Sequence, residues 1–260
     1  MRRLQLALII LACAGLAAPA AAMRPRYEAR LDAEELYQLA EAQLAAGKML
    51  KARDNYRLLR DRFPASPRAT LVQLRIADSL FESKNYDEAA VEYQLYLDFH
   101  PASLQAAYAH FQFAVCRLKE IRAFDRDLTD THEAVSGFRR LLKLFPDSEY
   151  AAKAQEHLQF LEDRLAAHDL YIGRFYYRTY RSKSALPRLE SALTAAHSDE
   201  LKAKAAYYIA LAELKLRNDD HARAALRKVL LGPPTEYTVK AAKLLQQIGT
   251  QSNGRDLTEG

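Results

Sequence analysis

Side chains that could catalyse a reaction or bind a metal are scattered along this chain of 260 residues. His132, His157 and His168 are the closest group among its seven histidines, and each lies among polar residues typical of a helix surface. The sequence lacks the HExxH zinc pattern, the G-x-S-x-G nucleophile turn, a glycine-rich phosphate loop and paired-cysteine zinc spacings. We therefore predict that the protein is not an enzyme and holds neither a metal nor a cofactor.

Cysteine chemistry is equally limited. Cys116 lies in the apolar helical pattern from Phe113 to Leu118, and the other cysteine, Cys13, lies near the N-terminus. A lone thiol in the body of the chain cannot form an intramolecular disulfide. We predict that Cys116 is a buried structural residue.

Aromatic and acidic side chains recur where peptide binding would use them. Repeats of paired helices expose the first helix of each pair on an inner wall. Aromatic anchors beside carboxylates suit an extended or hairpin peptide with aromatic side chains. The predicted groove residues are Tyr37, Glu41, Leu74, Asp78, Phe81, Tyr108 and Phe111. The alternative, that Tyr37, Phe81 and Phe111 pack between repeats, is open at this point.

A second aromatic group lies further along the chain and is rich in tyrosine and arginine, which are enriched at protein interfaces. About half of its tyrosines must face the core if these segments are helices. The group comprises Tyr176, Tyr177, Tyr180, Tyr207 and Tyr208, with Arg174, Arg178 and Arg181 interleaved.

A recurring spacing predicts the helices that position these residues. Ala134 is followed by Phe138, Leu141 and finally Pro146, which describes one buried helical stripe ended by a proline. The same twelve-residue interval from alanine to proline occurs at Ala52–Pro64, Ala89–Pro101, Ala134–Pro146 and Ala222–Pro234, and a fifth copy starts at Ala185 with His197 in place of proline. Helix, tight turn at Gly47, helix and proline within about 34 residues is the tetratricopeptide pattern.

Half of the residues are hydrophobic and only eight are glycine, which favours long helices with a sizeable core. We predict an all-α tetratricopeptide-repeat solenoid of five helix pairs over residues 32–248, with a C-terminal capping helix from Tyr237 to Ile248. The third repeat contains an extra polar loop at 121–131. The fourth contains a long helix at 149–166 and continues through Ile172. Residues 249–260 are predicted to be a disordered tail.

The charge balance points away from nucleic acid. The formal net charge is +5 with a pI of about 9.1. Basic residues alternate with acidic ones along the predicted helix faces, which is typical of a solvated surface. Nucleic-acid binding would require a concentrated basic stripe.

Residues 1–22 are predicted to be a signal peptide, because Arg2 and Arg3 precede a short apolar run and small residues follow it. The run is shorter than the roughly 20 residues that span a bilayer. Two interpretations of cleavage are open. A lipoprotein signal ending before Cys13 would leave that cysteine lipidated, whereas cleavage near Ala22 would leave no anchor. Residues 23–31 are predicted to be an exposed linker.

The middle of the chain resembles a known family. Around the repeat positions Ala134, Phe138 and Leu141, four runs that generic repeats do not require are RDLT at 126–129, FPDSEYA at 145–151, LEDRLA at 161–166 and IGRFY at 172–176. These resemble the BamD family of outer-membrane protein assembly factors. The resemblance covers about residues 30–245 and is most specific over 125–177.

The resemblance implies a non-catalytic scaffold and substrate receptor of the β-barrel assembly machinery, at the periplasmic face of the outer membrane. Its C-terminal repeats are expected to bind the periplasmic domains of the barrel-forming subunit. Its N-terminal repeats are expected to receive targeting peptides of unfolded outer-membrane proteins. Accessory lipoproteins are a further expected class of partner. Membrane attachment would come from a lipid anchor or through a partner.

In the family, an arginine, an apolar residue and a glutamate on the second helix of repeat four dock the barrel-forming subunit. The corresponding residues here are Arg188, Leu189 and Glu190, preceded by Pro187 where the family usually has asparagine. An exposed arginine suits a bidentate contact with a carboxylate. Arg174, Tyr177 and Arg181 complete the expected docking set.

A different function is also open. A periplasmic tetratricopeptide-repeat adaptor serving cell-wall or division machinery would need the same helix pairs but no barrel-forming partner.

Overall fold

The computed structural model describes residues 30–121 and 128–256, with side chains described through Gly249. The predicted signal peptide with Cys13, most of the predicted linker at 23–31 and the centre of the predicted loop at 121–131 lie outside the described residues. The chain divides into two compact units, residues 1–72 and 73–260, and each is described by itself.

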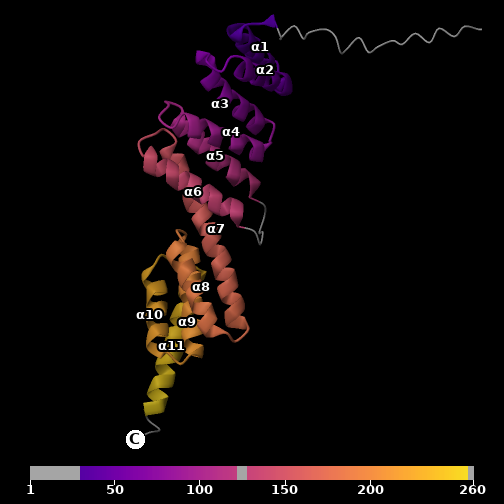
Figure 1. The fold of residues 1–260 in the computed structure, drawn as a ribbon. Coiled ribbons are helices and arrows are strands. Elements are labelled where there is room, and N and C mark those ends of the chain that lie inside the picture. The colour runs from indigo at the N-terminus through magenta and orange to yellow at the C-terminus, as the bar shows by residue number, and fades with distance from the viewer. Residues whose placement is uncertain (1–29, 122–127, 257–260) are drawn as a thin grey trace, which may run out of the picture. The chain divides into compact units, whose positions relative to one another are not determined.

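Every regular element in the described part of the chain is a helix (Figure 1). In the first unit, α1 (Ala33–Ala45) packs against α2 (Met49–Arg62). Helix α3 (Pro67–Glu82) begins in the first unit and ends in the second.

Helices α4 to α11 belong to the second unit, and each packs against the next along the chain. Their bounds are α4 (Tyr86–Phe99), α5 (Ala106–Glu120), α6 (Thr129–Leu144), α7 (Ala151–Arg178), α8 (Ser182–Ala195), α9 (Asp199–Lys215), α10 (Asp219–Leu231) and α11 (Glu236–Asp256). The described residues thus form five helix pairs and a closing helix, which confirms the predicted all-α repeat fold.

The turn inside a pair has the same geometry in four of the five pairs. In each of these turns, a residue that follows the first helix has a positive φ, between 59° and 70°. The residue after it donates its backbone N–H to the carbonyl of the residue five positions earlier in the chain. This hydrogen bond satisfies a carbonyl that the helix end would leave unpaired. The residues with positive φ are Gly47, Lys84, Tyr180 and Arg217. The turn predicted at Gly47 is confirmed, and glycine adopts this conformation without steric cost.

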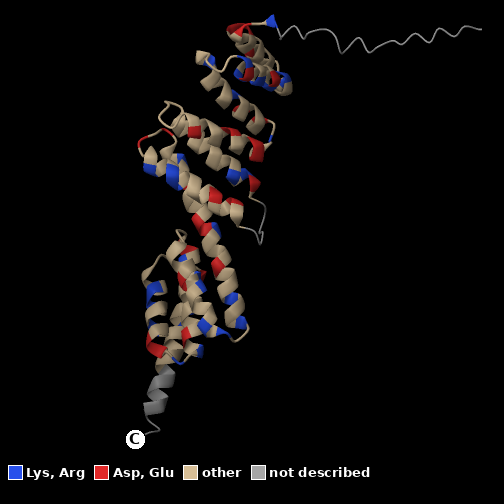
Figure 2. Ribbon diagram, in the orientation of Figure 1, with Lys and Arg blue, Asp and Glu red and all other residues tan. Residues whose placement is uncertain are grey.

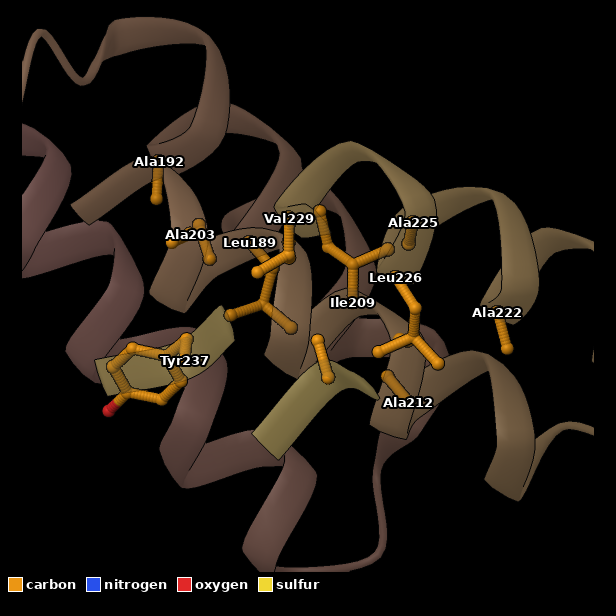
Figure 3. Packing of buried hydrophobic residues seen from close by; sticks show 14 of the residues in the cluster. Leu189, Ala192, Ala203, Ile209, Ala212, Ala222, Ala225, Leu226, Val229 and Tyr237 are labelled. Carbon is orange, nitrogen blue, oxygen red and sulfur yellow. The ribbon is translucent and has the colours of Figure 1, made fainter. Parts of the chain in front are cut away.

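The recurring alanine and the large residue four positions later form the centre of every pair. Both are fully buried on the second helix in all five pairs: Ala52 with Tyr56, Ala89 with Tyr93, Ala134 with Phe138, Ala185 with Leu189, and Ala222 with Leu226. Figure 3 shows the C-terminal part of this core, where Leu189 and Leu226 lie near Ile209 of α9. The sequence spacing therefore identified the core residues correctly.

Cys116 is fully buried in α5 and unpaired with another cysteine, which confirms the predicted structural role. Burial raises the pKa of its thiol to about 12. The reactive thiolate is therefore scarce at neutral pH.

Helix α7 corrects the prediction for the fourth repeat. The long helix predicted at 149–166 does not end there but runs without a break from Ala151 to Arg178, 28 residues in all. No proline interrupts this segment, and Gly173 is buried in it rather than terminating it. A Cβ at Gly173 would lie 2.6 Å from Cδ2 of Leu189, so glycine permits the close approach of α8.

The C-terminal end is also corrected. Helix α11 was predicted to stop at Ile248, but it continues to Asp256, into the segment predicted to be a disordered tail. Gly249 weakens a helix by about 1 kcal/mol relative to alanine, whereas only proline removes a helical hydrogen bond outright. Residues 257–260 lie outside the described residues.

Replacing Gly173 with alanine should lower the free energy of unfolding by about 1–3 kcal/mol, because the new methyl group would overlap the fully buried Leu189. Gly249→Ala is the matched control, since no atom lies within 4 Å of a Cβ built there. That change should raise stability by up to about 1 kcal/mol through helix propensity. Urea titrations followed by circular dichroism measure both, and equal stability of the two variants would contradict the predicted close contact.

Candidate peptide groove and docking surface

The seven predicted groove residues lie on the first helices of three pairs, as expected. Tyr37 and Glu41 are on α1, in the first unit. The other five, Leu74, Asp78, Phe81, Tyr108 and Phe111, are on α3 and α5, in the second unit. Each group is therefore considered within its own unit.

Tyr37 is a packing residue rather than an exposed anchor. It is only 8% exposed, its ring lies 6.3 Å from that of Tyr56, and the guanidinium of Arg68 lies 4.4 Å above it. Arg68 is itself held by Glu34, with Nε to Oε2 at 2.9 Å. Glu41 remains partly exposed and accepts a hydrogen bond from the Tyr56 hydroxyl at 2.7 Å.

Asp78 is the centre of a polar cluster that joins α3, α4 and α5. Its Oδ1 accepts hydrogen bonds from the hydroxyls of Tyr93 at 2.6 Å and Tyr108 at 2.7 Å. Burial raises the pKa of Asp78, while the two tyrosine hydrogen bonds act in the opposite direction. Burial and the nearby Asp78 carboxylate in turn raise the pKa of Tyr108 to about 12. Asp78 and Tyr108 therefore bind each other, and both keep partial exposure.

Leu74 and Phe111 are core residues, which corrects their prediction as surface anchors. Leu74 is buried. The buried Phe111 ring stacks on Tyr150 at a centroid distance of 5.3 Å and lies 6.0 Å from Phe138. Phe81 is partly exposed and packs edge-on against Tyr86 at 5.3 Å. The open alternative of packing between helices thus holds for Phe111 and Tyr37, and the partly exposed groove candidates are Glu41, Asp78, Phe81 and Tyr108.

The predicted docking residues separate into two groups. On α8, Arg188 and Glu190 are exposed. Nη1 of Arg188 donates to Oδ1 of Asp169 on α7 at 2.9 Å, and Ser191 Oγ donates to the other carboxylate oxygen at 2.6 Å. Asp169 therefore orients the Arg188 guanidinium while leaving much of it accessible.

The second docking group lies on α7 and packs against α9. The Arg174 guanidinium lies 4.8 Å from the ring centroid of Tyr208, and Tyr177 meets Tyr208 edge-on at 6.0 Å. Lys215 lies 3.9 Å from the Tyr177 ring centroid and donates to the Tyr177 carbonyl at 3.0 Å. Arg181 is exposed just before α8. Arg174 and Lys215 thus lie over tyrosine rings, which is a favourable cation–π arrangement.

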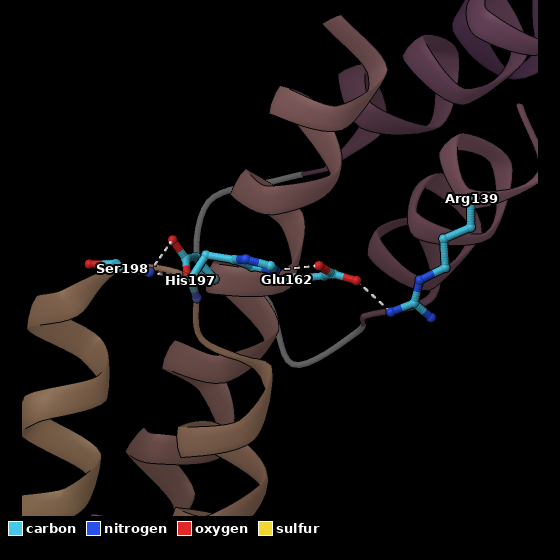
Figure 4. A network of polar contacts seen from close by, with 5 residues as sticks. Arg139, Glu162, His197 and Ser198 are labelled. Carbon is cyan, nitrogen blue, oxygen red and sulfur yellow. Dashed lines mark hydrogen bonds and ion pairs between the residues drawn. The ribbon is translucent and has the colours of Figure 1, made fainter. Parts of the chain in front are cut away.

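Two acidic residues of α7, which the sequence pattern did not single out, make polar contacts with neighbouring segments (Figure 4). Glu162 pairs with Arg139 of α6 on one side and with Nε2 of His197 at 2.6 Å on the other. The neighbouring Asp163 accepts from the backbone N–H groups of His197 and Ser198, at 2.6 and 3.0 Å. Both acids belong to the run LEDRLA, so these contacts explain why that run departs from a generic repeat.

Across the described residues, no cluster of three or more His, Cys, Asp or Glu side chains has the arrangement needed to hold a metal ion. None of the helices in the described part of the chain has both the length and the apolar character needed to span a bilayer.

Residues 29–231 match the family described as "Outer membrane lipoprotein", YfiO. This chain belongs to the YfiO family of outer membrane lipoproteins. The match covers all five helix pairs and confirms the resemblance stated from the runs at 126–176.

Similar proteins of this family carry the name outer membrane protein assembly factor BamD. The one from Caulobacter vibrioides is 24% identical over 90% of this chain and 77% of its own length. The one from Rickettsia prowazekii is 29% identical over 49% of this chain and 50% of its own length, and that from Neisseria gonorrhoeae is 28% identical over 55% and 57%. The chain thus spans about half the length of these last two relatives.

Among solved structures, the match to the "TPR2AB-domain:pHSP90-complex of yeast Sti1" covers 76% of this chain and 76% of that one, with 13% identity and a TM-score of 0.41. The five helix pairs described above, rather than this overlap, establish the repeat fold of the YfiO-family chain.

The partly buried Asp78 carboxylate should make stability depend on pH. The pKa of Asp78 is raised in the folded state. The stability that Asp78 contributes is therefore fully present below the pKa that its carboxyl has in the unfolded chain. This stability is lost as pH rises through the pKa that the carboxyl has in the folded protein. Asp78→Asn keeps the oxygen that both tyrosines contact but cannot ionise. The free energy of unfolding of the variant, minus that of wild type, should therefore increase as pH rises from 4 to 8.

Urea titrations of both proteins at each pH measure this difference, because contributions from all other groups cancel. A constant difference across the range would show that Asp78 titrates like a solvent-exposed carboxylate.

Proposed function

We propose that this chain is a non-catalytic scaffold and substrate receptor for the assembly and insertion of β-barrel proteins into the outer membrane, acting at its periplasmic face. Membership of the YfiO family over residues 29–231 carries the proposal, since relatives in that family are named outer membrane protein assembly factors. Paired helices with exposed arginine, tyrosine and carboxylate side chains suit protein binding.

The C-terminal repeats bind the periplasmic domains of the barrel-forming subunit. Arg188 supports this assignment because it is exposed and already oriented by Asp169. A guanidinium has five N–H donors in a fixed fork, so the bond to Asp169 leaves donors for a partner carboxylate. Pre-orientation also reduces the side-chain entropy lost on binding. Glu190, exposed on the same helix, adds a carboxylate for a basic group of the partner.

The N-terminal repeats receive targeting peptides of unfolded outer-membrane proteins. In the second unit, the partly exposed residues Phe81 and Tyr108 offer aromatic surface and Asp78 offers a carboxylate. In the first unit, Glu41 offers a carboxylate of its own. Within each unit, this assignment keeps the residues that a peptide can reach and excludes the buried Tyr37, Leu74 and Phe111 from direct contact.

Arg188→Glu should reduce recovery of the barrel-forming subunit with this chain by about tenfold or more, because a glutamate would repel the partner carboxylate. Lys183→Glu is the matched control, since it reverses an exposed charge on the same helix α8. Asp169→Asn should cause a smaller loss, because it only frees the guanidinium from its orientation. Quantitative co-purification from envelope extracts measures all three.

Unchanged recovery with Arg188→Glu would remove this contact from the proposal. Recovery of peptidoglycan-associated proteins in place of a barrel-forming subunit would favour the adaptor function instead.

A further inference from the structure

One side of α4 carries an apolar stripe that the described part of the chain leaves exposed. Val91, Leu95 and Phe99 are 54%, 38% and 71% exposed. Their spacing of four residues aligns them along one side of the helix. Leu104, in the turn that follows α4, is 97% exposed. A contiguous apolar surface of this kind marks an interaction site, whereas isolated exposed apolar residues do not.

The other repeats show that the fold does not require this stripe. Val91, Leu95 and Phe99 lie two, six and ten positions after the recurring alanine, Ala89. The same three positions in the other four repeats hold at most one large apolar residue each. They are Asp54, Leu58 and Arg62; Ser136, Arg140 and Leu144; Pro187, Ser191 and Ala195; and Ala224, Lys228 and Gly232. All five second helices pack through the same core positions. Packing therefore does not require apolar residues on the exposed side of α4.

The charge on α4 itself has one sign. Helix α4 contains four acidic residues and neither lysine nor arginine: Asp87, Glu88, Glu92 and Asp98 (Figure 2). Asp87 pairs with Arg117 of α5 at 2.9 Å, and Asp98 accepts from the Gln94 amide at 2.7 Å. Glu88 and Asp98 are exposed at opposite ends of the helix. An apolar strip with acidic ends complements a partner that is apolar with basic flanks.

A small cavity adjoins the stripe. It measures about 160 Å³ and lies between α4, α5 and α6. Gln94, three residues after Val91 and next to Leu95, forms its α4 edge. Phe113 and Gly137 contribute apolar lining, and the polar lining comes from His110, Glu133, Ser136 and Arg140. A cavity of about 150 Å³ is large enough to take up benzene, so this one has room for one side chain of a partner.

We propose that the outward face of α4 docks an amphipathic helix of a partner protein. The apolar side of that helix covers Val91, Leu95 and Phe99, one of its side chains enters the cavity, and its lysine or arginine residues face Glu88 and Asp98. Anchors at helical spacing on an apolar groove are an established mode of helix recognition. Two copies of this chain meeting through α4 would instead bring their acidic residues together, which is unfavourable. The proposal does not depend on the assembly function proposed above.

The test uses the full mature chain and two labelled model helices of about 18 residues, which is long enough for five helical turns. One has leucine along one side and lysine elsewhere, and the other has glutamate in place of every lysine. Fluorescence anisotropy measures binding to wild type, to Val91→Gln/Leu95→Gln/Phe99→Gln, and to Leu144→Gln. Leu144 is the matched control because it is 53% exposed at the position of α6 that corresponds to Phe99.

The lysine helix should bind wild type and Leu144→Gln equally, and the triple variant about tenfold more weakly. The glutamate helix should bind wild type about tenfold more weakly than the lysine helix, and Glu88→Lys/Asp98→Lys should reverse that preference. The double variant alters only exposed charges, so it carries the test if the triple variant fails to fold by circular dichroism.

Three results would overturn the proposal. They are undiminished binding of the lysine helix by the folded triple variant, equal binding of the two helices by wild type, and a wild-type dimer in sedimentation velocity that the triple variant cannot form. The last result would identify a second copy of the chain as the occupant.

Discussion

Close packing of a small residue against a large one is the constraint on which the rest of this structure depends. An alanine on each second helix lets a neighbouring helix approach, and the large side chain four residues later fills the adjacent space. Because a single helix pair leaves one apolar face uncovered, each pair requires a neighbour. The insertion in the fourth repeat is accommodated by extending α7 rather than by interrupting this packing.

Polar contacts then link consecutive pairs in the second unit. Asp78 joins three helices through two tyrosine hydroxyls, and Glu162 and Asp163 connect α7 to α6 and to the start of α9. Such groups are costly to bury unless they are paired, so each cluster favours one arrangement of its helices. The same pairing engages two predicted binding residues, Asp78 and Tyr108, with each other. A carboxylate that already accepts two hydroxyl groups is a poorer anchor for a peptide than an open one.

The surfaces proposed for binding lie at positions that the core does not use. Arg188 is oriented by a neighbouring carboxylate but exposed, and the α4 stripe is exposed with acidic residues at its ends. These two surfaces lie on second helices, α8 and α4, whereas the residues proposed for substrate contact lie on first helices. The five repeats can be compared with one another, because equivalent helices pack in the same way and differ in the side chains that they expose.

The sequence by itself determined the helix class, the five pairs, their core residues, the buried Cys116 and the family, because these follow from spacing along one chain and from local runs. Tertiary structure decided which first-helix residues stay accessible. A first helix contacts neighbours on more than one side, so Tyr37 and Phe111 match an exposed aromatic pattern and yet are covered by Arg68 and Tyr150. It also decided the unbroken course of α7 and the contacts of Glu162, since both depend on residues that meet only after the helices pack.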